Sequence, residues 1–148
     1  MNAKLIHSDL LPFFYNVTSH VGAGRTNNFE DVMLVEFLMQ KVGEFYREHG
    51  ALRNVLVNGA FDKNTADAII AFQTVEKRRR PAVVIDGVVS PQQGTSPAYG
   101  SAVWSICQLN KYVKDSYKQV WPRLQDLPGC PALLKQKCFE QIVGRETV

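Results

Sequence analysis

Residues 58–73 read NGAFDKNTADAIIAFQ, and no other stretch of the chain carries so many structural signals. The pair Asn58-Gly59 favours a tight turn with a positive φ angle, and Asp62 is a suitable N-cap for a following helix. A second glycine turn, Asp86-Gly87, follows this helix. The apolar residues of the helix recur at helical spacing and predict a buried stripe of Ala68, Ile69, Phe72 and Val75.

Helices are also predicted on both sides of this stretch. A central helix begins at a cap of Asn27 or Asn28 and stops at Gly50. A third helix begins at a Ser101 cap, and a last helix begins near Pro131. The apolar face of the third helix consists of Val103, Ile106, Cys107, Val113 and Tyr117. The last helix repeats apolar residues at four-residue steps, namely Leu134, Cys138 and Ile142.

This order of features resembles the peptidoglycan-binding-like family, a three-helix module often attached to cell-wall hydrolases. In that family a helix with a Val/Leu-rich stripe leads to an Asp-Gly-x-Phe-Gly turn and a threonine. A helix ending in Ala-Phe-Gln, a second Asp-Gly turn and a third helix follow. The residues of this chain that match are 31–38, Asn58-Gly59-Ala60-Phe61, Thr65, Ala71-Phe72-Gln73 and Asp86-Gly87-Val88-Val89. Asn58 replaces the first aspartate and Asp62 the second glycine, and the similarity covers roughly residues 28–115.

The length of the chain predicts a single domain spanning residues 1–148, and the resemblance implies a mainly α fold for its core. Residues 28–115 would form the three-helix core, with residues 1–27 and 116–148 as N- and C-terminal helical extensions. At most a very short β hairpin is expected, where valines flank Asp86-Gly87. Loops at 50–57, 77–82 and 90–100 are longer or more charged than in the family, so they would alter the border of any groove.

The function implied by the resemblance is non-catalytic recognition of bacterial cell-wall peptidoglycan, which would bring an associated protein to the wall. The alternative is a protein-interaction adaptor, as a structural subunit of a secretion or phage-like injection system or as a toxin partner. An enzyme hidden in the extra segments is a third alternative, and no catalytic motif supports it. A sugar–peptide ligand needs aromatic rings and groups that bind carboxylates. The candidate ligand-binding residues are Tyr46, Arg47, Arg53, Asn58 and Tyr99.

The basic run of Lys77, Arg78, Arg79 and Arg80 allows three interpretations. It is a solvated helix end favoured by the helix dipole, a contact for an acidic partner, or a nucleic-acid contact. A run of this length without an aromatic platform or recognition helix argues against nucleic acid. The formal net charge is +3, so the chain without this run would carry 3 − 4 = −1. The basicity is therefore local.

Composition and spacing exclude several other classes. The 45% hydrophobic and 21% charged content is ordinary for a globular protein. His7, His20 and His49 match no metal-site pattern, and no cofactor is expected. The three cysteines are expected to stay reduced. The start of the chain lacks the apolar core of a signal peptide, and no membrane span is expected. These features predict synthesis in the cytoplasm, with the protein either staying there or reaching the cell envelope by a signal-peptide-independent route.

Overall fold

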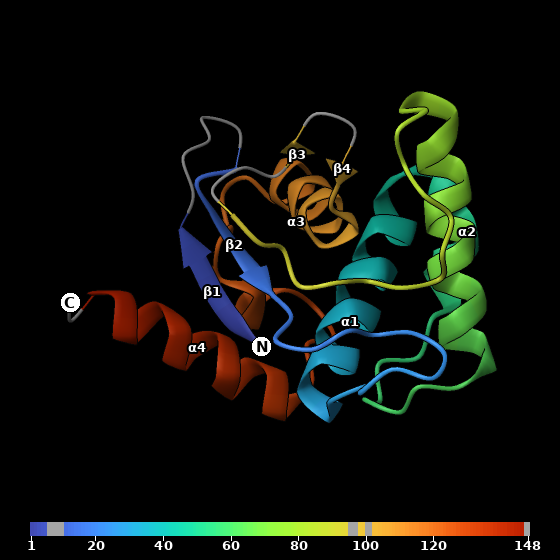
Figure 1. Ribbon diagram of the computed structural model, residues 1–148. Coiled ribbons are helices and arrows are strands. Elements are labelled where there is room, and N and C mark those ends of the chain that lie inside the picture. The colour runs from blue at the N-terminus through green and yellow to red at the C-terminus, as the bar shows by residue number, and fades with distance from the viewer. Residues whose placement is uncertain (6–10, 95–97, 100–101, 147–148) are drawn as a thin grey trace.

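A computed structural model describes the backbone of residues 1–5, 11–94, 98–99 and 102–146, and the side chains of residues 1–5, 11–94 and 104–142 (Figure 1). The fold is mainly helical, as predicted, and its strands form two short antiparallel pairs within the described residues. Helix α1 lies in the middle, with α2 on one side and α4 and the β1–β2 hairpin on the other (Figure 1). One hydrophobic core draws on all these elements, including Phe14, Leu38, Ile69, Leu109 and Cys138.

Helix α1, Phe29–Phe45, is the central element, as its apolar sequence predicts. Asn28 is its N-cap residue, one of the two predicted positions, but the Asn28 side chain forms no capping hydrogen bond. Asn27, at φ 53°, instead bonds the preceding loop. The helix also ends before Gly50, and the chain continues as the 3-10 helix η1, Arg47–Asn54. Gly43 permits η1 to pack closely against α1, since a Cβ there would lie 2.3 Å from a backbone nitrogen of η1.

The first glycine turn is fastened to α1 by a buried carboxylate. Glu36 is 1% exposed, and its Oε1 accepts hydrogen bonds from the amides of Asn58 and Gly59 at 3.1 and 2.8 Å. Its Oε2 accepts the Thr65 hydroxyl at 2.8 Å. Gly59 has the expected positive φ, 76°, and a Cβ there would collide with the Phe29 ring. This one side chain therefore joins α1, the turn and the start of α2.

Helix α2, Lys63–Arg79, begins as predicted, because the Asp62 carboxylate accepts the Thr65 amide at 2.9 Å. Ala68, Ile69 and Phe72 are buried as expected. Val75 is only half-buried, and the buried position near that end of the helix belongs to Glu76.

The second glycine turn is held by Gln73. Its carboxamide oxygen accepts the Gly87 amide at 2.9 Å, and its Nε2 donates to the Val88 carbonyl at 3.0 Å. The valines around this turn do not pair with each other as a hairpin. Val89 instead pairs with Val21, with N–O distances of 3.0 and 2.8 Å, because the N-terminal segment lies against the turn.

The N-terminal residues form strands, and their predicted helical character is wrong. Strand β1, Asn2–Leu5, pairs antiparallel with β2, Phe13–Asn16, with Leu5 opposite Phe13. Every residue of β2 is buried. Three consecutive aromatic residues in β2 favour an extended chain over a helix, because aromatic side chains pack well on a pleated surface.

Helix α3, Ser105–Ser116, begins later than predicted. Val103 belongs to strand β4, Ala102–Val103, which pairs with β3, Ala98–Tyr99, and the predicted cap Ser101 lies outside the described residues. Asn110 of α3 binds both the amide and the carbonyl of Tyr15, at 2.8 and 2.9 Å, which ties the helix to β2.

The C-terminal part is helical, as expected. A short 3-10 helix, η2, covers Leu124–Asp126, and α4 covers Ala132–Glu146, directly after Pro131. Leu134 and Cys138 of α4 are buried as predicted, and Ile142 is half-buried.

All three cysteines are free and buried, as expected. Burial raises the pKa of the Cys107 thiol to about 12 and that of Cys130 to about 11, so these thiols are protonated at neutral pH. Among the described helices, none is both long and apolar enough to span a bilayer.

Asp31 fixes the loop before α1. Its carboxylate, fully buried, accepts hydrogen bonds from the Thr18 and Ser19 amides at 3.1 and 3.0 Å and from the Ser19 hydroxyl at 2.7 Å, and it pairs with the Met1 amino group at 3.0 Å. Burial by itself would raise the pKa of Asp31. The hydrogen bonds from Ser19, Met1 and Thr18 outweigh burial, so the pKa lies below its usual value.

We expect Glu36→Ala to lower the free energy of unfolding by about 2–3 kcal/mol, because it leaves buried amides and a hydroxyl without an acceptor. Glu36→Gln should cost at most about 1 kcal/mol, since its oxygen still accepts the turn amides and its amino group can donate to Thr65. Burial raises the pKa of Glu36 despite these hydrogen bonds, so a neutral replacement suits the site. Urea unfolding measures the loss of unfolding free energy in both variants, and equal losses in Glu36→Ala and Glu36→Gln would contradict this expectation.

Asp31→Asn should lower stability in a pH-dependent way. A carboxyl whose pKa is lowered by folding contributes stability above its unfolded pKa of about 4, and that contribution is lost as the pH falls through the folded value. We expect a deficit of about 2 kcal/mol at pH 7 that shrinks below about pH 4. Urea midpoints at several pH values test this, and a deficit that stays constant with pH would refute it.

Candidate functional site

A series of hydrogen-bonded polar side chains, His49, Glu76, Tyr112 and Arg79, links η1, α2 and α3, and we call it the polar chain. His49 Nε2 lies 2.9 Å from Glu76 Oε2, and both side chains are 1% exposed. The Tyr112 hydroxyl donates to the same Glu76 oxygen at 2.7 Å. Tyr112 in turn accepts a hydrogen bond from Arg79 Nη1 at 3.2 Å, while Arg79 Nη2 pairs with Glu48. The position of the Arg79 guanidinium is thus set from the interior of the protein.

Tyr112 is the central member of this chain. Burial, followed by its hydrogen bond to Glu76 and the charge of that carboxylate, raises the pKa of Tyr112 to about 12. The hydroxyl therefore keeps its proton at neutral pH and serves Glu76 as a donor and Arg79 as an acceptor. The His49 ring stacks on Phe72 with centroids 4.9 Å apart, which holds the inner end of the chain.

A small basic pocket of about 110 Å³ opens above this chain, between the end of α2 and α3. Its described lining contains three cationic side chains and no carboxylate. The lining residues are Arg79, Arg80, Gln108, Lys111 and Tyr112. Lys111 also pairs with Asp115, one helical turn along α3, at 2.8 Å.

An aromatic cluster lies beside the basic pocket, at the end of α1. The Tyr46 ring lies 4.7 Å from the Tyr112 ring and 5.2 Å from the Phe45 ring, measured between centroids. Phe45 lies 6.5 Å from Tyr117, which follows α3. Phe45 is 58% exposed, although it is large and apolar. We call these four residues, Phe45, Tyr46, Tyr112 and Tyr117, the aromatic cluster.

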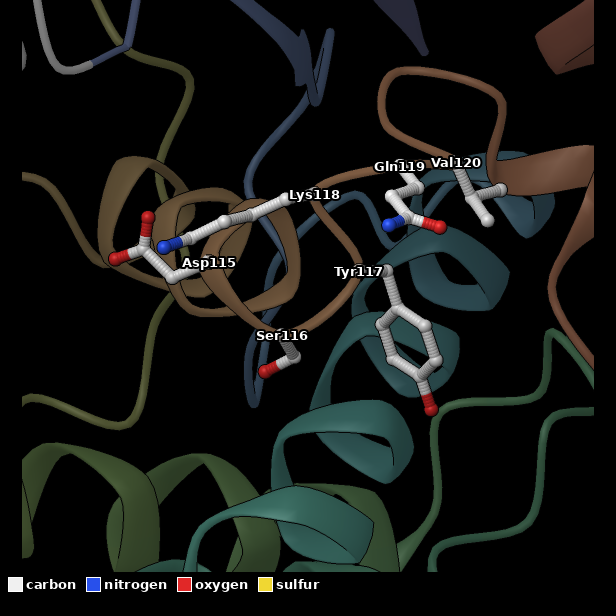
Figure 2. A pocket seen from close by; sticks show the side chains of 6 residues that line it. All are labelled: Asp115, Ser116, Tyr117, Lys118, Gln119 and Val120. Atoms are coloured by element: carbon white, nitrogen blue, oxygen red, sulfur yellow. The ribbon is translucent and has the colours of Figure 1, made fainter.

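A second, larger pocket of about 410 Å³ includes Tyr117 of this cluster in its lining. It is lined by the continuous segment 115–120, where the chain leaves α3 (Figure 2). Figure 2 shows the Tyr117 side chain extending away from Asp115 and Lys118. Tyr112 lines the first pocket and Tyr117 the second, so the aromatic cluster connects the two.

The structure places the predicted ligand-binding residues apart. Tyr46 belongs to the aromatic cluster, but the described linings of the two pockets do not include Arg47, Arg53 or Asn58. Arg47 and Arg53 are exposed at the two ends of η1. The Asn58 side chain accepts a hydrogen bond within its own turn, at 2.9 Å. Tyr99 lies in β3, and its side chain is outside the described part of the chain.

The basic run divides into residues with different roles. Lys77 donates to two carbonyls of the loop after α2, at 2.9 and 2.8 Å, so it closes the helix end. Arg78 is exposed and does not line the basic pocket. Arg79 and Arg80 line that pocket, which agrees with their predicted role as contacts for an acidic partner without testing it.

Sequence reasoning missed Phe45, Gln108, Lys111 and Tyr112. One signal was present, because Gln108, Lys111 and Tyr112 recur at helical spacing and give the third helix a polar face opposite its apolar one. The approach of that face to the end of α2 is a tertiary contact that this spacing does not encode.

This surface can bind an anionic group and an aromatic or sugar face side by side. Among the described residues, no group of histidines, cysteines or carboxylates could hold a metal ion. Comparisons with protein-family models, with curated proteins and with solved structures found no match for this chain.

Tyr112→Phe removes two hydrogen bonds from the polar chain, and we expect it to lower the free energy of unfolding by about 1–2 kcal/mol. Tyr46→Phe is the matched control in the same cluster. The Tyr46 hydroxyl makes one long bond, 3.4 Å, to a backbone carbonyl, so its loss should cost less than about 0.5 kcal/mol. Thermal or urea unfolding compares the two variants. If Tyr46→Phe lowers the free energy of unfolding as much as Tyr112→Phe, the hydrogen bonds of the polar chain do not stabilise the fold as expected.

Proposed function

We propose that the chain is a non-catalytic binding module that recognises bacterial cell-wall peptidoglycan and brings an associated protein to the wall. Peptidoglycan combines sugar rings with short peptides that carry carboxylates. Sugar faces stack on exposed aromatic rings, and carboxylates bind guanidinium and ammonium groups. The observation that carries the proposal is the aromatic cluster, with Phe45 58% exposed, directly beside the basic pocket.

The two glycine turns support the same proposal. Glu36 holds the first turn and Gln73 holds the second, and both side chains are 1% exposed. The residues on which the resemblance to the peptidoglycan-binding-like family rests therefore pack as one turn–helix–turn unit. This unit is scaffold, and the proposed ligand surface lies at the opposite end of α2 from the first turn.

A second candidate function is an adaptor in a secretion or phage-like injection system, or a toxin partner. It is favoured by exposed apolar side chains on α2 and on the loop after it. Ile70 is 46% exposed, and Val84 and Ile85 are 66% and 43% exposed. Ile70 borders this loop, since a Cβ on Gly87 would lie 3.4 Å from it. Apolar side chains gathered in this way are typical of protein contacts.

Sedimentation with purified wall sacculi tests wall binding. We expect the wild type to pellet with sacculi at low salt, and Phe45→Ala to bind about two- to tenfold more weakly, because a stacked aromatic ring contributes about 0.5–1.5 kcal/mol. Phe139→Ala is the matched control, since Phe139 lies on α4 and is 57% exposed against 58% for Phe45.

Wild-type protein that stays in the supernatant at low salt would contradict wall binding and favour the adaptor. Equal loss of binding in Phe45→Ala and Phe139→Ala would show that the aromatic cluster is not the contact surface. Circular dichroism of both variants checks that each is folded.

A further inference from the structure

The basic pocket contains a polar side chain with nothing to bind. Gln108 is only 6% exposed, and it lines the pocket from α3. Its carboxamide forms no hydrogen bond with any residue that the structure describes, and it is not among the fully buried unpaired groups, so it is accessible from the pocket. An amide donor that is free at the wall of a cationic pocket suits a ligand that accepts hydrogen bonds.

The charges around the pocket indicate how much negative charge that ligand carries. Arg79 is neutralised by Glu48, and Lys111 by Asp115. Arg80 has no ion pair within the described part of the chain. One uncompensated positive charge matches a singly charged carboxylate better than a doubly charged phosphate. A guanidinium also matches the planar geometry of a carboxylate, since it can donate two parallel hydrogen bonds.

The walls of the pocket are held in place before any ligand arrives. Tyr112 is fixed by its bond to the buried Glu76, and Arg79 is fixed by Tyr112 and Glu48. A site ordered in advance loses little conformational entropy on binding. Its volume of about 110 Å³ admits a group of a few non-hydrogen atoms, such as a carboxylate with its α-carbon and side-chain methyl.

We propose that this pocket is a carboxylate-binding subsite, in which Arg80 pairs with the free carboxylate of a peptide and the Gln108 amide donates to it. The subsite rests on the proposed wall-binding function, because the peptides of peptidoglycan supply that carboxylate. The neighbouring aromatic cluster then contacts the remainder of the same ligand, since Tyr112 belongs to both.

An NMR titration of the full chain tests this subsite. The probe is N-acetyl-D-alanyl-D-alanine, which has one carboxylate, and its C-terminal amide is the neutral control. We expect the acid to give saturable shifts of the Gln108 side-chain amide signals and the amide to give none. Inorganic phosphate at the same ionic strength should bind more weakly than the acid. Equal shifts from acid and amide, or no saturable shift, would overturn the proposal, and tighter binding of phosphate would reassign the pocket to phosphate groups.

Two substitutions locate the contact. Arg80→Gln should weaken binding of the acid about tenfold, because it removes the uncompensated charge. Arg78→Gln removes an equal charge from the same run but outside the pocket, and should change binding less than about twofold. Both positions are exposed, so neither variant is expected to unfold. Equal effects from the two variants would mean that general charge, and not the pocket, attracts the probe.

The result of the NMR titration can be distinguished from the result of the sedimentation experiment with sacculi. If the wild type pellets with sacculi but the acid probe does not bind, the subsite is wrong and wall binding stands. If the probe binds through Arg80 but the protein does not pellet, the carboxylate subsite stands and peptidoglycan is not its source.

Discussion

The carboxylate of Glu36 determines how the helices meet. It is buried on the central helix, and it accepts hydrogen bonds from the two amides of the first glycine turn and from the Thr65 hydroxyl. A buried carboxylate is costly unless such donors surround it. The turn supplies these donors only when it lies against α1 in one arrangement. The interaction thus fixes where α2 begins and in which direction it leaves.

The candidate site depends on this arrangement although it lies at the other end of α2. An α-helix of 17 residues is about 25 Å long and nearly rigid, so the position of its start sets the position of its end. At that end Glu76 meets His49, and Arg79 meets Tyr112. Gln73, between the two ends, fastens the second turn. The side chains that hold the scaffold and those that shape the pocket therefore occupy successive parts of one helix.

Local chemistry in the sequence was enough to predict the turn at Gly59, the Asp62 cap and the apolar stripe of α2, because each depends on neighbours in the chain. The N-terminal strands were not predicted. Strand β2 contains a run of three aromatic residues, and its partner strand β1 shows no clear alternation of apolar and polar residues. Pairing of Val89 with Val21 was also missed, since it joins residues far apart in sequence. For the site, the sequence predicts the basic run at the end of α2 as a contact for an acidic partner, and this stays a prediction, whereas the contact of Arg79 with Tyr112 required the tertiary structure.

The basic run illustrates how folding changes the meaning of charge in a sequence. Read as a string, residues 77–80 form a cluster suited to any polyanion. In the folded chain Lys77 is engaged by loop carbonyls and Arg79 by Glu48 and Tyr112, and Arg80 faces the pocket. The recognition proposed for this pocket depends on short, directed hydrogen bonds more than on a long-range field. This arrangement favours one small anionic group over an extended charged polymer.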